Sequence, residues 1–174
     1  MSIGIFDSGV GGLSIAQKIR EILPHEDLIY LADSGHAPYG EKSQLYITQR
    51  CSTIIQLLID KGARLIVIAC NTATVSAIKA LREEFAIPIV GVEPGVKTAV
   101  LSSTSGVVGI LATTQTLKSP AFHQLAQRVA KDVTVVMQAC PGLVEQVEAL
   151  HLNGHKTQSL VEQYVQPLVD KGAD

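Results

Sequence analysis

A run of apolar residues that ends in a cysteine constrains the fold of this chain most strongly. The run, Leu65–Ala69, follows Gly62 and precedes a polar turn, and its length predicts a strand buried on both faces. A helix is predicted directly after it, with Thr72 or Thr74 as its cap. Cys70 is therefore expected where a central parallel strand ends and a helix begins.

Strands and helices alternate along the rest of the chain, which predicts an α/β fold with mainly parallel sheets. The predicted strands cover residues 2–6, 27–32, 65–69, 87–92, 107–111 and 132–137. The predicted helices cover residues 13–23, 43–61, 75–85, 119–130, 142–150 and 156–171, and a further helix ends near residue 101. Residues 33–40 and 112–116 are predicted to be loops at the carboxyl ends of strands.

Two parts of the chain resemble each other, and this internal repeat predicts two pseudo-symmetric lobes. Residues 58–64 (LIDKGAR) align with residues 168–174 (LVDKGAD), and residues 3–8 align with residues 108–113. We expect an N-terminal α/β lobe over residues 1–101 and a second α/β lobe over residues 106–174. The first copy of the repeat leads into the strand before Cys70, whereas the second copy ends the chain. The second lobe is therefore expected to be incomplete and the chain truncated at its C-terminus.

Composition narrows the function classes. A formal net charge of −2, 4% aromatic residues and no tryptophan argue against a nucleic-acid or anionic-membrane surface. No segment reaches the ~18 apolar residues of a membrane span, and the N-terminus lacks the basic region of a signal peptide. Three widely spaced cysteines suit a reducing cytoplasm better than a disulfide framework or a zinc site.

The predicted position of Cys70 suggests a ligand-binding or reactive role. Ligands bind at the carboxyl edge of open α/β sheets, and the N–H groups that begin a helix favour a thiolate or a substrate carboxylate. The alternative is a small buried residue without a reactive role, because free cysteines are often buried.

A glycine-rich loop, Ser8–Gly12, follows Asp7 at the end of the first predicted strand. It could bind a dinucleotide, with Asp33 on the ribose, but an ionised Asp7 would repel a pyrophosphate and the GK[ST] ending is absent. A carboxylate here suits an ammonium group or a thiol that needs a proton partner. Asp7 could also be a simple cap or turn residue.

The remaining candidates have open alternatives. His36 is expected to be solvated rather than a metal ligand. Tyr39 could close a pocket or pack on the sheet edge. Cys140 and Cys51 are interpreted as structural. Glu148 lies on a helical face that is solvated by default, although it could reach a site between the lobes.

Three groups of residues, in this order, resemble the glutamate racemases of the cofactor-independent Asp/Glu racemase superfamily. They are Asp7–Gly12 (DSGVGG), Pro38–Gly40 (PYG) and Ala69–Thr74 (ACNTAT). Residues 111–116 and 139–148 are similar to later parts of the same family. The resemblance implies a racemase that uses two thiols and neither a cofactor nor a metal.

The resemblance also implies a role for each matching residue. Cys70 would be one of two catalytic thiols, Asp7 its proton partner, and Glu148 an acid on the opposite face of the substrate. The expected contacts with glutamate are Asp7, Ser8, Tyr39, Gly40, Asn71 and Thr72, with Thr113 and Thr116 from the second lobe.

The family's second catalytic cysteine belongs to a Gly-Cys-Thr-His motif that these 174 residues do not contain. We therefore expect the complete protein to interconvert L- and D-glutamate for peptidoglycan synthesis, and the 174-residue chain to be inactive. A non-catalytic amino-acid-binding fragment, an aspartate racemase, a single-thiol decarboxylase and a nucleotide-binding module stay open. A homodimer is also open, because an unpaired sheet edge favours pairing with a second copy.

Overall fold

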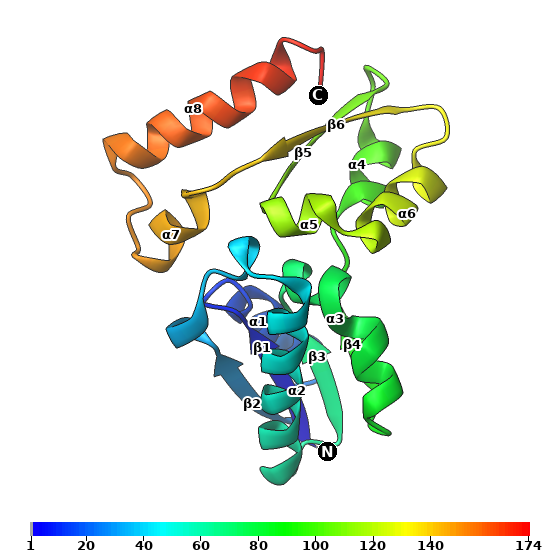
Figure 1. The fold of residues 1–174 in the computed structure, drawn as a ribbon, viewed down its shortest axis with the longest axis vertical. Helices are drawn as coiled ribbons and strands as arrows, with labels where there is room; N and C mark the ends of the chain where they lie inside the picture. Colours follow the sequence, from blue (N-terminus) through cyan, green and yellow to red (C-terminus); the bar gives the residue numbers. More distant parts are fainter. Residues whose placement is uncertain (1) are drawn as a thin grey trace. The chain divides into compact units, whose positions relative to one another are not determined.

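The structure, a computed structural model, describes residues 2–174. It consists of two compact units, one that ends at Glu93 and one that runs from Pro94 to Asp174 (Figure 1). Helix α4 (Val96–Ser102) packs on α6 (Pro120–Val129), so it belongs to the second unit, whereas the sequence interpretation placed residues up to 101 in the first lobe.

The first unit is built on a four-stranded parallel sheet in the order β2-β1-β3-β4. Its strands are β1 (Ser2–Asp7), β2 (Asp27–Ala32), β3 (Leu65–Ile68) and β4 (Ile89–Gly91). Its helices are α1 (Leu13–Ile22), α2 (Gln44–Asp60) and α3 (Asn71–Glu84), with 3-10 turns η1 (Ser34–His36) and η2 (Tyr39–Glu41). The two central strands, β1 and β3, are the most deeply buried.

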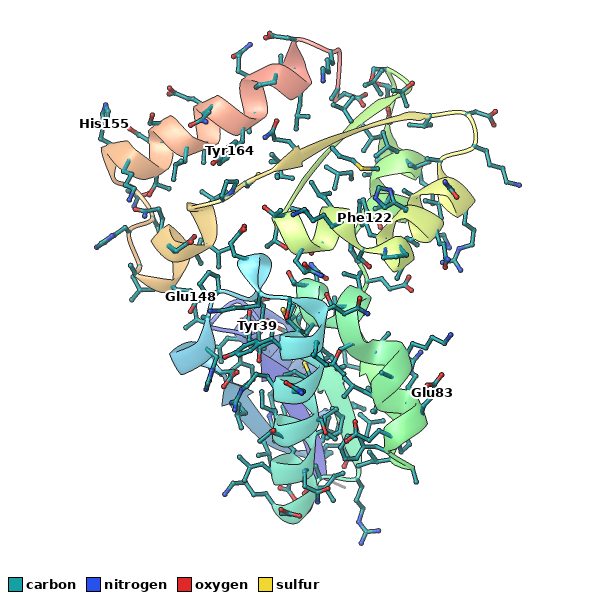
Figure 2. The ribbon with its side chains drawn as sticks, in the orientation of Figure 1. Tyr39, Glu83, Phe122, Glu148, His155 and Tyr164 are labelled. Atoms are coloured by element: carbon teal, nitrogen blue, oxygen red, sulfur yellow. The ribbon has the colours of Figure 1, made fainter. Side chains whose placement is uncertain are left out.

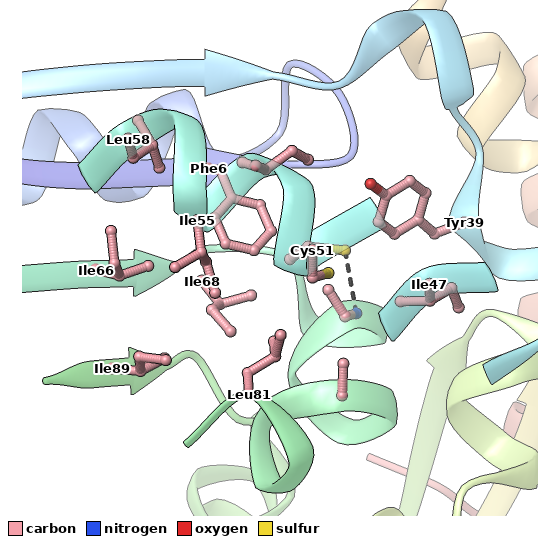
Figure 3. Packing of buried hydrophobic residues seen from close by; sticks show 14 of the residues in the cluster. Phe6, Tyr39, Ile47, Cys51, Ile55, Leu58, Ile66, Ile68, Leu81 and Ile89 are labelled. Atoms are coloured by element: carbon pink, nitrogen blue, oxygen red, sulfur yellow. Dashed lines mark hydrogen bonds between the residues drawn. The ribbon is translucent and has the colours of Figure 1, made fainter. Parts of the chain in front are cut away.

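Helices cover both faces of this sheet, as a parallel sheet requires. Helices α2 and α3 contribute one core with Phe6, Ile66 and Ile68 of the strands (Figure 3). Helix α1 packs over the other face, against Ile5 and Val67. The unbroken apolar runs of β1 and β3 fit this burial on both faces, which confirms the predicted class of strand.

The second unit has a two-stranded parallel sheet of β5 (Val107–Ala112) and β6 (Thr134–Ala139). Helix α8 (His155–Val169) packs on both strands, whereas α4 packs on β5 and α5 (Thr114–Lys118) on β6. Helix α7 (Leu143–Glu148) precedes α8, and Tyr164 of α8 donates from its hydroxyl to the carbonyl of Pro141 at 2.7 Å (Figure 2). The predicted α/β fold with parallel sheets is thus confirmed.

Several predicted boundaries were wrong. Residues 112–116 were expected to be a loop, but Thr113 caps the short helix α5. The strand expected at 87–92 covers only Ile89–Gly91, and the strand expected at 132–137 covers Thr134–Ala139. In the part of the chain from residue 2 onward, no helix is long and apolar enough to cross a membrane.

Candidate active site

The site lies at the carboxyl edge of the first sheet, where β1 and β3 are neighbours. The chain leaves β1 through α1 on one face and reaches β3 from α2 on the other, so the connections diverge between these strands. Such a divergence is where open parallel sheets bind ligands. Backbone bonds extend beyond the strands here: Ala69 N donates to Phe6 O at 2.8 Å.

Cys70 itself caps helix α3. Its sulfur accepts the N–H of Ala73 at 3.4 Å, and its thiol donates to Ser8 Oγ at 3.5 Å. The prediction that Thr72 or Thr74 caps this helix was therefore wrong, because the chain turns into the helix directly after β3. Cys70 is 7% exposed, at the border between the core and the edge of the sheet.

Asp7 is held by the glycine loop that follows it. Its Oδ2 accepts the N–H groups of Gly9 at 3.2 Å and Gly12 at 3.0 Å. The loop is fixed in turn by Tyr30, whose hydroxyl donates to Gly9 O at 3.0 Å. Position 12 requires glycine, because a Cβ there would lie 2.6 Å from Asp7 Cβ and 2.9 Å from Ala69 Cβ. The carboxylate is thus buried and oriented by backbone donors beside Cys70.

The electrostatics of Cys70 differ from the sequence expectation. Burial raises the pKa of the Cys70 thiol and the nearby charge of Asp7 raises it further, while the hydrogen bonds of the sulfur with Ser8 and Ala73 lower it. The helix N-terminus alone suggested a favoured thiolate, but desolvation outweighs it. Cys51 and Cys140 are also free and buried, and burial raises the pKa of each.

Tyr39 does not close a pocket with its ring. The side chain is 1% exposed and lies among the buried core residues of the first unit (Figure 3), and its hydroxyl donates to Asp33 Oδ2 at 2.6 Å. Burial and this hydrogen bond raise the pKa of the Tyr39 phenol. Gly40, the next residue of η2, is also buried.

Sequence reasoning missed the partner of Asp33. Arg50, on α2, donates to both of its carboxylate oxygens, from Nη2 at 2.6 Å and from Nε at 3.1 Å. This pairing also leaves Asp33 unsuited to binding a ribose. His36 was expected to be solvated, but it is half-buried with Nδ1 2.6 Å from the hydroxyl of Tyr46.

The predicted site residues fall into two groups, one in each unit. In the first unit, the ends of β1 and β3 bring Asp7, Ser8 and Cys70 together. Also in this unit, Asn71 is exposed and Thr72 is buried in the first turn of α3. Among residues 2–174, no group of three or more histidine, cysteine or acidic side chains could hold a metal ion.

In the second unit, the predicted residues follow β5 and lie on α7. Thr113 Oγ1 accepts the N–H of Thr116 at 3.2 Å and lies 3.0 Å from its hydroxyl oxygen, so the two threonines form one cap. Glu148 is half-buried at the end of α7, whereas Glu145 is exposed.

Comparison with known proteins identifies the family. The profile of the Asp/Glu/Hydantoin racemase family matches residues 3–174. The chain belongs to the Asp/Glu/Hydantoin racemase family. Within it, the chain is 54% identical over 172 residues to the glutamate racemase of Methylococcus capsulatus, covering 99% of this chain and 64% of that protein.

Solved structures agree. Glutamate racemase from Escherichia coli, in complex with L-glutamate and the activator UDP-MurNAc-ala, matches with a TM-score of 0.86 and 37% identity, over 95% of this chain and 63% of that one. Glutamate racemase from Francisella tularensis, in complex with D-glutamate, matches with a TM-score of 0.83 and 33% identity. This match covers 99% of this chain and 65% of that one. The predicted resemblance to glutamate racemases is therefore confirmed, and the chain spans somewhat less than two thirds of these relatives.

Proposed function

We propose that the complete protein is a glutamate racemase that interconverts L- and D-glutamate without a cofactor, with Cys70 serving one face of the α-carbon. One observation carries this proposal: Cys70 caps a helix at the divergence of a parallel sheet, beside the oriented carboxylate of Asp7. The relatives that match the whole length of this chain bear the name glutamate racemase.

The chemistry requires a proton to leave one face of the α-carbon and another to arrive on the opposite face. Without an electron sink such as a pyridoxal cofactor, hydrogen bonds and positioning must stabilise the carbanion. Cys70 would remove or return the proton as the base or acid of its face, with Asp7 as its proton partner. A bound amino acid brings a positive ammonium group, which would lower the raised pKa of the Cys70 thiol when the base is needed.

The proposal also assigns the residues that bind the substrate and the acid for the opposite face. The N-terminus of α3, which begins at Asn71, suits the α-carboxylate of the substrate. Glu148 is proposed as the acid for the opposite face. The proposed substrate contacts are Asp7, Ser8, the backbone of Tyr39 and Gly40, Asn71 and Thr72, with Thr113 and Thr116 of the second unit.

We propose further that the 174-residue chain by itself racemises little or no glutamate. A two-thiol reaction needs a second cysteine beside an acid at a sheet edge, and neither Cys51 nor Cys140 is predicted to have this role. Cys51 lies wholly within the core, and the Cys140 thiol donates to Gln138 O at 3.4 Å. Three reduced thiols suit the cytoplasm, where D-glutamate would serve peptidoglycan synthesis, and a homodimer stays part of the proposal.

The raised pKa of the Cys70 thiol favours one second candidate, an amino-acid-binding unit without catalysis. The two candidates differ in what happens to bound glutamate. Chiral chromatography of L-glutamate incubated with the complete protein should show D-glutamate, and Cys70→Ala should abolish it. Binding of glutamate without any change of configuration would instead establish the binding unit. Product analysis with aspartate and dicarboxylic acids tests the aspartate racemase and the decarboxylase.

The activity of residues 1–174 alone is tested separately. Purified residues 1–174 are expected to show no turnover of L-glutamate above the Cys70→Ala variant. Turnover by this chain that depends on Cys70 would disprove the proposal that it needs a second thiol.

A further inference from the structure

The loop between β2 and α2 is held by a network of three side chains, of which Asp33 and Tyr39 are buried and Arg50 is partly buried. Arg50 pairs with both carboxylate oxygens of Asp33, and the Tyr39 hydroxyl donates to Oδ2 of the same carboxylate. The carboxylate of Asp33 therefore joins helix α2 to the 3-10 turn η2, which carries Tyr39 and Gly40. Asp33 is 6% exposed and Tyr39 is 1% exposed, whereas the side chain of Arg50 is 26% exposed.

The same network is attached to the reactive edge of the sheet. The backbone N–H of Asp33 donates to the carbonyl of Asp7 at 2.9 Å, one step beyond the last paired residues of β1 and β2. The residue that Arg50 holds by its side chain is thus hydrogen-bonded through its backbone to Asp7. A shift of Asp33 would move the backbone of η2 relative to Asp7 and Cys70.

Arg50 is the residue that holds the Asp33 carboxylate in place. Without it, a buried negative charge would lose its cationic partner, which is unfavourable because burial penalises charged groups. The planar guanidinium meets both oxygens at once, and a lysine cannot reproduce this contact. The hydrogen bond with Asp33 accordingly raises the pKa of Arg50. Tyr39 then finds a fixed acceptor, and its ring is locked in the core.

We propose that Arg50 and Asp33 are positioning residues for substrate binding. They touch no substrate and act through Tyr39, fixing the backbone of η2, whose Tyr39 belongs to the same core cluster as Cys70. This inference rests on the proposed function, because it assigns the backbone of η2 to the bound amino acid.

The test follows alkylation of Cys70 in residues 1–174 by iodoacetamide, read by peptide mass spectrometry, with L- or D-glutamate as the protecting ligand. Arg50→Lys keeps the charge but loses the two-pronged contact, and Tyr39→Phe removes one oxygen. We expect Arg50→Lys to raise the glutamate concentration for half-protection about tenfold, and Tyr39→Phe to raise it less. The alkylation rate without glutamate should stay unchanged in both.

Arg82→Lys is the matched control. Arg82 also makes a two-pronged contact in the first unit, donating to Ile89 O from Nε at 3.0 Å and from Nη2 at 2.8 Å. This substitution should lower Tm as Arg50→Lys does, without changing the half-protection concentration. A purely structural role for Arg50 would make the two lysine variants alike.

The possible failures are distinguishable. If glutamate does not protect Cys70 in the unmodified chain, this inference is overturned, whereas the proposed function is decided separately by turnover of L-glutamate by the complete protein. If protection occurs but Arg50→Lys and Tyr39→Phe respond as Arg82→Lys does, the inference alone is overturned. A faster alkylation of Cys70 without glutamate in both variants would also overturn it, since the network would then only keep the unit closed. If Arg50→Lys does not fold, the half-protection concentration of Tyr39→Phe decides the test.

Discussion

The two units share a backbone plan but differ at the tips of their strands. In the first, Ala63 N donates to Leu58 O at 2.9 Å and Arg64 N to Ser2 O at 2.9 Å. In the second, Ala173 N donates to Leu168 O at 3.1 Å and Asp174 N to Val107 O at 3.2 Å. The repeated residues therefore end α2 and α8 in the same way and bring the chain back to β1 and β5.

The strand tips carry different chemistry. β1 ends in Asp7, held by glycine N–H groups, whereas the matching position of β5 is Ala112, followed by Thr113 as a helix cap. The residue after β2 is the ion-paired Asp33, and the residue after β6 is Cys140. The comparison teaches that the repeat supplies the scaffold, while the reactive groups are a property of the loops that follow each strand.

Of the predictions that follow, the largest effect is expected from a substitution in the glycine loop of the first unit. Gly12→Ala would place a Cβ 2.6 Å from Asp7 Cβ, and we expect it to lower the free energy of unfolding by about 3 kcal/mol, as overpacking does. Gly11→Ala is the control, because a Cβ there would lie 3.6 Å from Asp7 Oδ2, an ordinary contact. Urea unfolding measures both. Equal losses for the two variants would contradict the crowding described at Gly12.

A second prediction separates the thiols of the two units by pH. The charge of Asp7 raises the pKa of Cys70, whereas no carboxylate contributes to the raised pKa of Cys140. Asp7→Asn keeps an oxygen for the N–H groups of the loop but removes the charge. The pH midpoint for alkylation of Cys70 should therefore fall, and the rate at a fixed pH below it should rise.

Cys140 is the internal reference for this experiment. Its alkylation profile, read from the same digests, should not change in Asp7→Asn. A midpoint for Cys70 that stays in place or rises would show that Asp7 does not act on the thiol through its charge.

The smallest effect tests whether the repeated turns are equivalent. Gly62 and Gly172 follow Lys61 and Lys171 with φ of +93° and +80°, and a Cβ at either would meet open space. Alanine at each position should therefore cost only the strain of a positive φ, about 1 kcal/mol. Thermal unfolding of Gly62→Ala and Gly172→Ala compares them. Clearly unequal costs would show that the two turns are not structural copies.

Local patterns accounted for most of the fold. The apolar runs of β1 and β3 and the repeated LxDKGA sequence are short-range signals, and the structure has the predicted strands and turns. Helix α5 was missed because its five residues include two threonines, which are weak helix formers. Its helix depends on the cap that Thr113 makes with Thr116.

The candidate site was only partly predictable. The positions of Cys70 and Asp7 follow from strand ends, which the sequence marks. The pair of Asp33 and Arg50 has no local pattern, since a turn-rich loop and about the first two turns of α2 separate its members. The inward direction of the Tyr39 ring and the raised pKa of Cys70 depend on burial by distant segments, which no spacing in the sequence records.

The burial of all three sulfurs has a practical consequence for anyone handling this protein. Oxidants and metals attack the thiolate form, and burial disfavours that form by raising the pKa of Cys51, Cys70 and Cys140. Air and trace peroxide should consequently damage it slowly during storage. Under the proposed function, the ammonium group of a bound amino acid would lower the pKa of the Cys70 thiol and so make its sulfur more open to oxidation.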